Sequence, residues 1–156
     1  MVVAARDAYP EYERHSAYVC HTGRAFRKGL RRMAFYTSGE IQREVPEILE
    51  DRDPVVFSAQ EAQRYRVSDD DTDRLIGRAI DEMLADGPRA PGESYQVFLL
   101  SGRDDKRTLV LPRPVRNTTR NRSEKLWAWT LGQRYTRSDV LKRAPTTTDE
   151  LAANGG

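Results

Sequence analysis

The sequence predicts an α+β fold: a small mixed or mainly antiparallel sheet, or a partly closed barrel, with one main helix and short C-terminal helices. Short segments rich in β-branched and aromatic residues recur between turn residues, which is typical of strands. One segment repeats apolar residues at helical spacing. With 156 residues, of which 38% are hydrophobic and 32% charged, the chain is long and apolar enough to bury a core.

Six segments have the composition of strands. They are residues 16–22, 33–37, 54–58, 95–101, 108–111 and 127–130. The fourth and fifth flank a polar turn and are expected to pair as an antiparallel hairpin. Residues 41–48 carry apolar side chains at mixed spacing around Pro46, so this stretch is expected to be irregular.

The main helix is predicted over residues 71–86. Its buried face consists of apolar residues at a spacing of 3.6: Leu75, Ile76, Ala79, Ile80, Met83 and Leu84. Asp and Thr residues are available to cap its start, and Gly87-Pro88 ends it. Shorter helical turns are expected at residues 138–143 and 148–153.

The chain is expected to form a single α+β domain over residues 15–145. A flexible, polar N-terminal arm (residues 1–14) would precede this domain, and a polar tail (residues 146–156) would follow it. The single cysteine, Cys20, excludes an intrachain disulfide, which fits a reducing compartment. The longest strongly apolar run, residues 97–100, is far shorter than the ~20 residues that cross a bilayer. A soluble, cytoplasmic protein without a membrane partner is therefore expected.

Charge is distributed unevenly along the chain. Residues 1–39 carry +4, residues 40–105 carry −9 and residues 106–156 carry +7, although the net charge is only +2. Arginine outnumbers lysine 22 to 4, a usage that a GC-rich genome would produce whatever the function. The segregation of charge is therefore more informative than the number of arginines.

The segment 113–143 is basic and contains aromatic residues. It has nine Lys or Arg residues and only two acidic residues, and Trp127, Trp129 and Tyr135 lie among them. Such a combination can hold a polyanion and stack its bases. The two Trp residues alternate with small residues, so their indoles are expected on one face. That face could belong to the core or could contact a ligand.

Arginine binds phosphate through a planar fork and stacks on bases, which favours RNA or single-stranded DNA as the partner. We therefore predict a module that binds nucleic acid or a nucleotide-like ligand, without a cofactor or metal. A second basic segment, residues 24–32, would extend the surface if it meets the first in the fold. The candidate binding residues are Arg24, Arg27, Lys28, Arg31, Arg113, Arg116, Arg120, Arg122, Arg134 and Tyr135.

An enzyme acting on nucleic acid is the first alternative. Asp104 and Lys106 form a D-x-K pattern that resembles part of the PD-(D/E)xK nuclease signature. The resemblance implies that carboxylates hold Mg²⁺, with Asp86 or Glu93 as the upstream candidate, and that the lysine orients or activates water. Turn chemistry accounts for the same aspartates without catalysis.

Other chemical signals are weak. Cys20 and His21 are neighbours on a predicted strand and would point to opposite faces, so they cannot easily share a metal. The acidic run 69–73 lacks the Gly and Glu of a calcium loop and is explained by capping of the main helix. His21 and Tyr36 are the other candidates for a catalytic role. A protein–protein interaction module that docks an acidic partner is the second alternative.

Residues 28–41, KGLRRMAFYTSGEI, place a glycine turn at Gly29, an aromatic pair at Phe35-Tyr36 and a small-residue turn at Ser38-Gly39. In this order the segment resembles the PUA-like barrels, particularly the ASCH and EVE groups. The resemblance implies a barrel that binds RNA or a modified nucleobase, the latter in an aromatic-lined pocket.

Overall fold

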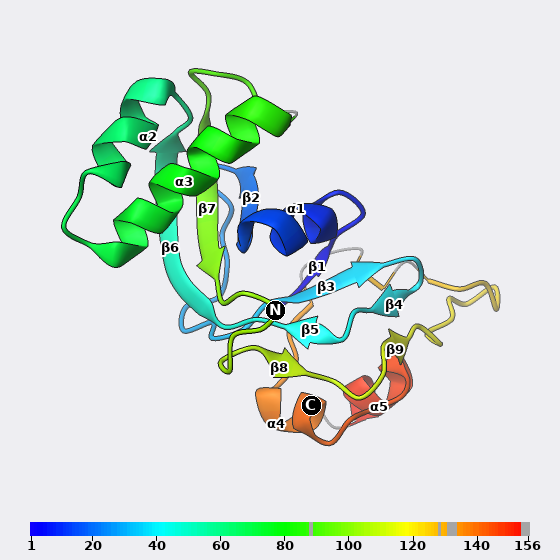
Figure 1. Cartoon of the computed structure of the whole chain (residues 1–156). Helices are drawn as coiled ribbons and strands as arrows, with labels where there is room; N and C mark the ends of the chain where they lie inside the picture. Colours follow the sequence, from blue (N-terminus) through cyan, green and yellow to red (C-terminus); the bar gives the residue numbers. More distant parts are fainter. Residues whose placement is uncertain (88, 128, 131–133, 154–156) are drawn as a thin grey trace. The chain divides into compact units, whose positions relative to one another are not determined.

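The computed structural model describes residues 1–87, 89–127, 129–130 and 134–153. The chain has a mixed α+β fold and forms two compact units (Figure 1). Unit 1 comprises Met1–Tyr9, Leu30–Glu47 and Arg103–Gly156, and unit 2 comprises Pro10–Gly29 and Ile48–Gly102. These boundaries differ from the predicted single domain over residues 15–145, because each unit gathers segments that are distant in sequence.

Unit 1 contains a four-stranded sheet in the order β1-β3-β4-β9. Its strands are β1 (Val2–Ala4), β3 (Ala34–Thr37), β4 (Glu40–Ile41) and β9 (Val115–Arg116). The β1–β3 pair is parallel and the other pairs are antiparallel. A second, antiparallel pair joins β5 (Glu44–Val45) to β8 (Leu109–Val110), and the helices α4 (Ser138–Lys142) and α5 (Thr148–Ala153) follow.

The core of unit 1 draws on all of these segments. Its larger members are Val2, Ile41, Val45, Leu111, Val115, Trp129, Val140, Leu141 and Leu151. Residues from the predicted N-terminal arm and C-terminal tail therefore belong to the core of the unit.

The N-terminal arm predicted over residues 1–14 is instead a strand and a helix, β1 and α1 (Ala8–His15). Val2 and Val3 are buried and pair with Ala34 and Phe35 of β3. Tyr12 of α1 is fully buried. These elements are too short to show a period in the sequence, but their few large apolar side chains are enough to anchor them.

Unit 2 is a three-stranded antiparallel sheet with two helices on one face. The strands are β2 (Ala17–His21), β7 (Ser94–Leu100) and β6 (Ile48–Val56), in the order β2-β7-β6. The helices are α2 (Ala59–Arg66) and α3 (Asp71–Asp86). Figure 1 shows both helices packed beside the sheet, and their apolar residues share a core with alternate residues of the three strands.

Helix α2 escapes prediction because only Ala62 and Tyr65 of its eight residues are buried. Its start is capped by Ser58, whose Oγ accepts a hydrogen bond of 3.1 Å from the Glu61 amide. The helix lies very close to α3 at Gly77, where an added Cβ would stand 2.7 Å from the Ala62 carbonyl oxygen. Gly77 is therefore the residue that permits this close packing.

Several predicted elements are confirmed. The strands at 16–22 and 33–37, the main helix at 71–86 and the helical turns at 138–143 and 148–153 all occur, with changes of at most two residues at their ends. The predicted strand at 127–130 includes residue 128, which lies outside the described residues. Pro88, expected to end the main helix, lies outside them as well.

The other strand predictions require correction. The strands predicted at 95–101 and 108–111 occur as β7 and β8, but their pairing as a hairpin is wrong, because β7 pairs with β2 and β6 whereas β8 pairs with β5. The strand expected at 54–58 is the end of the longer β6, and the stretch expected to be irregular at 41–48 contains β5 and parts of β4 and β6. The sheets formed by the described residues are mostly antiparallel and do not close into a barrel. None of the described helices is long and apolar enough to span a bilayer.

Candidate nucleic-acid interface

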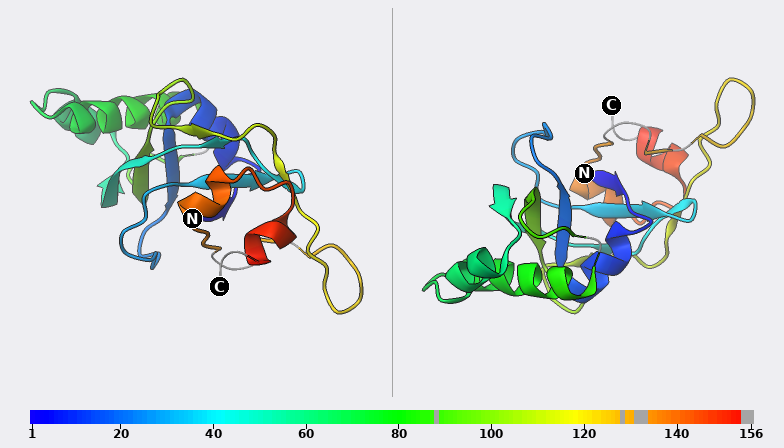
Figure 2. Two further views of the ribbon diagram at one scale, coloured as in Figure 1. Left: turned by 90° about the horizontal axis from the view of Figure 1, so that it is seen from below. Right: turned by 90° about the horizontal axis from the view of Figure 1, so that it is seen from above.

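The first half of the basic segment forms a projecting arm in unit 1, residues 117–127. The arm leaves β9, turns near residues 121–125 and returns to Trp127, whose amide donates a 2.9 Å hydrogen bond to the Thr119 carbonyl oxygen. Arg120 and Leu126 face each other in an antiparallel bridge. Figure 2 shows the arm as a long loop that extends beyond β9 and α5. We refer to residues 117–127 as the basic arm.

The side chain of Asn117 holds the base of the arm. Its Nδ2 donates to the Tyr36 hydroxyl at 2.8 Å and to the Trp127 carbonyl oxygen at 2.7 Å. Its Oδ1 accepts from the Thr119 amide at 3.1 Å and from the Thr148 hydroxyl at 3.2 Å. Asn117 is only 7% exposed, and both hydrogens and both lone pairs of its amide group are used.

Thr148, the first residue of α5, completes this network. Its fully buried hydroxyl oxygen also accepts from the Thr118 amide at 3.0 Å and lies 2.9 Å from the Thr119 hydroxyl. Thr118 in turn donates its hydroxyl to Asp149 at 2.8 Å. Because a fully satisfied buried network permits few alternative arrangements, the outgoing and the returning segment are both fixed at the base of the arm.

Asn121 organises the tip of the arm. Its Oδ1 accepts hydrogen bonds from the Ser123 amide at 2.9 Å and the Lys125 amide at 3.0 Å. Its backbone amide donates to the Lys125 carbonyl oxygen at 2.8 Å. Glu124 has a positive φ of 58°, which closes the turn. The tip is thus built from polar backbone contacts and contains no apolar cluster.

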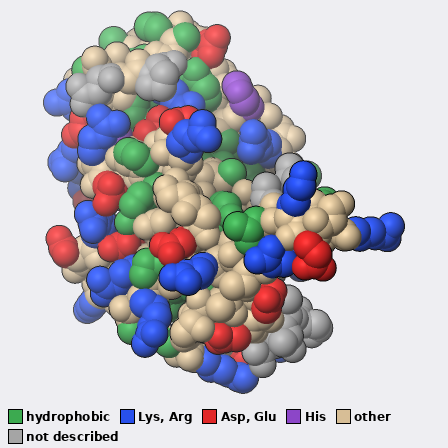
Figure 3. All heavy atoms as spheres, turned by 90° about the vertical axis from the view of Figure 1, so that its right-hand side faces the viewer, with side chains coloured by type: hydrophobic (Ala, Val, Ile, Leu, Met, Phe, Trp, Pro, Cys, Tyr) green, Lys and Arg blue, Asp and Glu red, His purple; other side chains and the backbone are tan. Residues whose placement is uncertain are grey.

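Five cations lie on the arm and on the chain that leads into it: Arg113, Arg116, Arg120, Arg122 and Lys125. All five are exposed, and none forms an ion pair with a carboxylate among the described residues. Glu124 is the single acidic residue between 113 and 127, so this stretch carries +4 (five cations minus one carboxylate). In Figure 3 the arm projects at the right and displays Lys and Arg side chains.

The two tryptophans have different environments. Trp129 is 7% exposed and belongs to the core of unit 1, with its ring 6.4 Å from that of Tyr36. Trp127 is 38% exposed and follows Leu126, which is 62% exposed. The two indoles, which were expected on one face, thus differ in exposure: Trp129 is buried and Trp127 is partly exposed.

Arg134 and Tyr135 do not lie on the arm. The Arg134 guanidinium donates to the Trp129 carbonyl oxygen at 2.8 Å and lies over the Trp129 ring, 5.8 Å from its centre. This arginine therefore packs against the core tryptophan and is only partly exposed. Tyr135 is also half-buried.

The second basic segment is divided between the units. Arg24, Arg27 and Lys28 are exposed residues of unit 2, whereas Arg31 is an exposed residue of unit 1. A common surface for this segment and the arm stays a prediction.

The D-x-K pattern lies in a polar turn between β7 and β8. Asp105 is engaged by the neighbouring Arg107, with oxygen–nitrogen distances of 2.5 to 3.1 Å, and this arginine lowers the pKa of Asp105 to about 2. Asp104 and Lys106 are exposed. No group of three or more His, Cys, Asp or Glu side chains in the described parts of the chain could hold a metal ion.

His21 and Tyr36, the other catalytic candidates, belong to different units. His21 is exposed at the end of β2, with its ring 6.4 Å from that of Tyr95. Tyr36 accepts the hydrogen bond from Asn117 and so supports the arm. The adjacent Cys20 is buried, and burial raises the pKa of its thiol to about 11. Cys20 is consequently protonated and a poor nucleophile at neutral pH.

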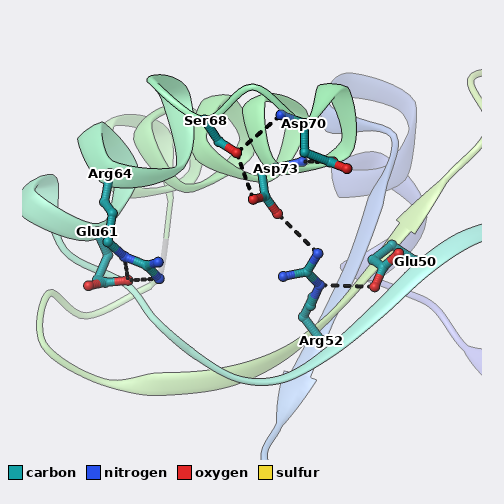
Figure 4. Close-up of polar contacts among 7 residues, drawn as sticks. All are labelled: Glu50, Arg52, Glu61, Arg64, Ser68, Asp70 and Asp73. Carbon is teal, nitrogen blue, oxygen red and sulfur yellow. Dashed lines mark hydrogen bonds and ion pairs between the residues drawn. The ribbon is translucent and has the colours of Figure 1, made fainter.

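The acidic run at the start of α3 has the capping role expected of it. Asp70 accepts from the Asp73 amide at 3.0 Å, and the Ser68 hydroxyl donates to Asp73 at 2.9 Å (Figure 4). Asp73 also forms an ion pair of 3.0 Å with Arg52, which contacts Glu50 at 2.9 Å. These carboxylates are used within unit 2.

No model of a known protein family matches the chain, and no curated protein matches it. The resemblances to PUA-like barrels and to the nuclease signature therefore stay predictions.

Proposed function

We propose that this protein binds nucleic acid through the phosphate backbone, with the basic arm and the residues leading into it as the contact surface. The observation that carries the proposal is the group of five exposed cations without carboxylate partners among the described residues. Cations that are not neutralised internally are available to replace the counterions of a polyanion, and release of those counterions drives binding.

The hydrogen-bonded backbone at the base of the arm supports the same proposal. A mobile loop would lose conformational entropy on binding, whereas a loop that is already fixed loses less. The hydrogen bonds of Asn117 and Thr148 fix the outgoing and the returning segment at the base of the arm. The cations beyond this base are long side chains on a defined backbone, which suits contact with successive phosphates.

The cations of the arm also differ from three arginines on the helices α2 and α3 of unit 2. Arg64, Arg66 and Arg74 each form an ion pair, with Glu61, Asp81 and Asp71 respectively. A polyanion would have to displace these carboxylates, so the paired arginines should contribute little to binding. The protein thus provides a matched control for the arm.

The test is a salt titration of binding to fluorescently labelled single-stranded and duplex oligonucleotides of mixed sequence. With four to six phosphates neutralised, log K should fall against log[salt] with a slope of roughly −3 to −5. The triple variant Arg120→Ala, Arg122→Ala, Lys125→Ala should reduce the magnitude of this slope by about 2. The control variant Arg64→Ala, Arg66→Ala, Arg74→Ala has the same change in net charge and should leave the slope nearly unchanged.

Two results would overturn the proposal. One is a wild-type protein whose binding is weak and independent of salt. The other is an equal loss of binding in the two triple variants, which would show that only overall charge matters. A third variant, Arg24→Ala, Arg27→Ala, Lys28→Ala, tests the predicted contribution of the second basic segment. A smaller magnitude of the slope of log K against log[salt] in this variant than in the wild type would assign that segment to the same interaction.

A further inference from the structure

The exposed tryptophan of the arm is held in an unusual way. Trp127 is fixed through its backbone on both sides, because its amide donates to Thr119 and its carbonyl oxygen accepts from Asn117. The residue is nevertheless 38% exposed. A large apolar ring in contact with water is unfavourable for the isolated protein, while the fixed backbone limits the ways in which the ring could become buried.

Cations precede Trp127 along the arm. Lys125 lies two residues before Trp127, and Arg120 pairs with the neighbouring Leu126 in the bridge, with its guanidinium donating a 2.6 Å hydrogen bond to the Glu124 carbonyl oxygen. An exposed aromatic ring on an arm that also carries cations is complementary to a chain that alternates flat apolar rings with negative charges. Single-stranded nucleic acid has this chemistry, since its bases are accessible for stacking and its phosphates follow at regular intervals.

The other tryptophan makes the contrast clear. Trp129 stands two residues later but contributes its ring to the core of unit 1. The core therefore accounts for Trp129, whereas Trp127 is not a member of that core among the residues that the structure describes.

We infer that Trp127 is a base-stacking residue and that the arm prefers single-stranded nucleic acid to a duplex. This inference rests on the proposed function and adds the class of nucleic acid to it. In a duplex the bases are already stacked on one another, so the ring of Trp127 would find no face to cover. The cations would still contact the phosphates of either form.

An anionic membrane is the other partner with both negative charge and apolar groups. Insertion into a membrane requires apolar side chains at the end of a projecting loop, whereas residues 121–124 at the tip of the arm are Asn, Arg, Ser and Glu. The apolar pair Leu126 and Trp127 lies behind this polar tip, on the returning chain. The arrangement favours a strand that lies along the arm over a bilayer that receives its end.

The experiment compares Trp127→Ala, Trp127→Phe and Leu126→Ala in binding to a 12-nucleotide single strand and to the duplex of the same sequence. Trp127→Ala should weaken binding to the single strand about 5- to 100-fold, with little change for the duplex and an unchanged salt slope. Trp127→Phe should restore a large part of the affinity because a ring is retained. Leu126→Ala removes a neighbouring exposed apolar side chain and should have a small effect.

Intrinsic fluorescence gives a direct readout of the same contact. A single strand such as dT12 should protect the exposed indole from acrylamide, and this protection should be absent in Trp127→Phe. Emission from the buried Trp129 reports whether unit 1 of each variant is folded.

The outcomes separate the inference from the proposed function. Equal losses for single strand and duplex in Trp127→Ala, or no loss for either, would overturn stacking while salt-dependent binding remained. Absence of salt-dependent binding in the wild type would overturn both. Binding to vesicles that contain anionic lipid, without binding to oligonucleotides, would identify a membrane as the partner and overturn both.

Discussion

The helical layer of unit 2 and the basic arm of unit 1 are stabilised by different interactions. In unit 2, the side chains of Phe57, Ile76 and Ile80 are fully buried between the helices and the sheet. At the base of the arm, the central group is the amide of Asn117, which makes four hydrogen bonds. Apolar burial is non-directional and covers surface, whereas hydrogen bonds are directional and fix the backbone.

The difference explains how one small chain combines a core with an accessible surface. A loop that is held by apolar side chains must turn those side chains inward. A loop that is held by a buried amide and a threonine hydroxyl can leave its remaining side chains in water. The arm therefore displays Arg120, Arg122, Lys125 and Trp127 without becoming disordered.

The largest effect is expected from the core of unit 2. Ile80→Ala removes a fully buried side chain and should lower the free energy of unfolding by about 2–5 kcal/mol. Leu75→Ala on the same helix is the control, because Leu75 is 41% exposed and its loss should cost about 0.5 kcal/mol or less. Chemical denaturation measures both variants.

Two local probes distinguish the units in this experiment. The single cysteine, Cys20, lies in unit 2, and both tryptophans lie in unit 1. Thiol labelling of Cys20 should become faster at lower denaturant in Ile80→Ala, because the buried thiol is exposed when unit 2 opens. If labelling of Ile80→Ala and Leu75→Ala were identical, apolar packing would not be the dominant interaction in unit 2.

The next effect concerns the base of the arm. Asn117→Ala leaves the Trp127 carbonyl oxygen, the Thr119 amide and the Thr148 hydroxyl without their partner, which should cost roughly 1–3 kcal/mol. Unfolding of unit 1, followed by tryptophan fluorescence, should occur at a lower denaturant concentration than in the wild type. The stacking contribution to single-strand binding should fall with it, because Trp127 is no longer fixed.

Asn121→Ala is the control for Asn117→Ala. It removes an asparagine from the same arm, but one that bonds to two amides in a half-exposed turn. Water can replace these bonds, so the stability of unit 1 should change little. Equal effects of the two substitutions would argue against a special role for the buried network.

A smaller net effect is expected at the contact between α2 and α3. Gly77→Ala would bring a Cβ within 2.7 to 2.8 Å of the Ala62 carbonyl oxygen and the Arg66 backbone nitrogen. Overpacking typically costs 1–3 kcal/mol, and replacement of Gly by Ala in a helix returns about 1 kcal/mol. We expect a net loss of about 1 kcal/mol, measured by denaturation with Cys20 labelling. Increased stability would show that the helices can move apart without cost.

Elements with a clear local signal could be predicted from the sequence. The helix at 71–86 was identifiable because its apolar period is long and acidic residues precede it. The helix at 59–66 was not, because it buries only Ala62 and Tyr65 and depends on the close approach at Gly77. The strand at 2–4 was missed for a similar reason: three residues are too few for a pattern, and the pairing partner is about 30 residues away.

The candidate site was predictable only in part. The clustering of arginines in residues 113–125 indicated the basic arm, since no apolar pattern competes there. The different exposures of Trp127 and Trp129 depend on packing within unit 1, which the alternation of residues along a predicted strand does not reveal. Asn117 and Thr148 were missed as a pair because they are 31 residues apart and only the fold brings them together. A buried Asn or Thr has no distinctive signature in a single sequence.

The smallest effect is expected for a solvent-exposed polar contact, between Arg107 and Asp105. Arg107 lowers the pKa of Asp105 from its ordinary value of 3.8 to about 2 in an exposed turn of unit 1. A carboxyl with a lowered pKa in the folded state stabilises the fold above pH 3.8, and this contribution disappears as the pH falls toward 2. Arg107→Ala should return the pKa of Asp105 toward 3.8, as measured by NMR titration of its carboxyl carbon, with almost no change in stability at pH 7. A large loss of stability at pH 7 would mean that an exposed contact can hold this unit as firmly as the buried bonds of Asn117. A small loss would show that burial, more than the number of polar contacts, gives the base of the arm its strength.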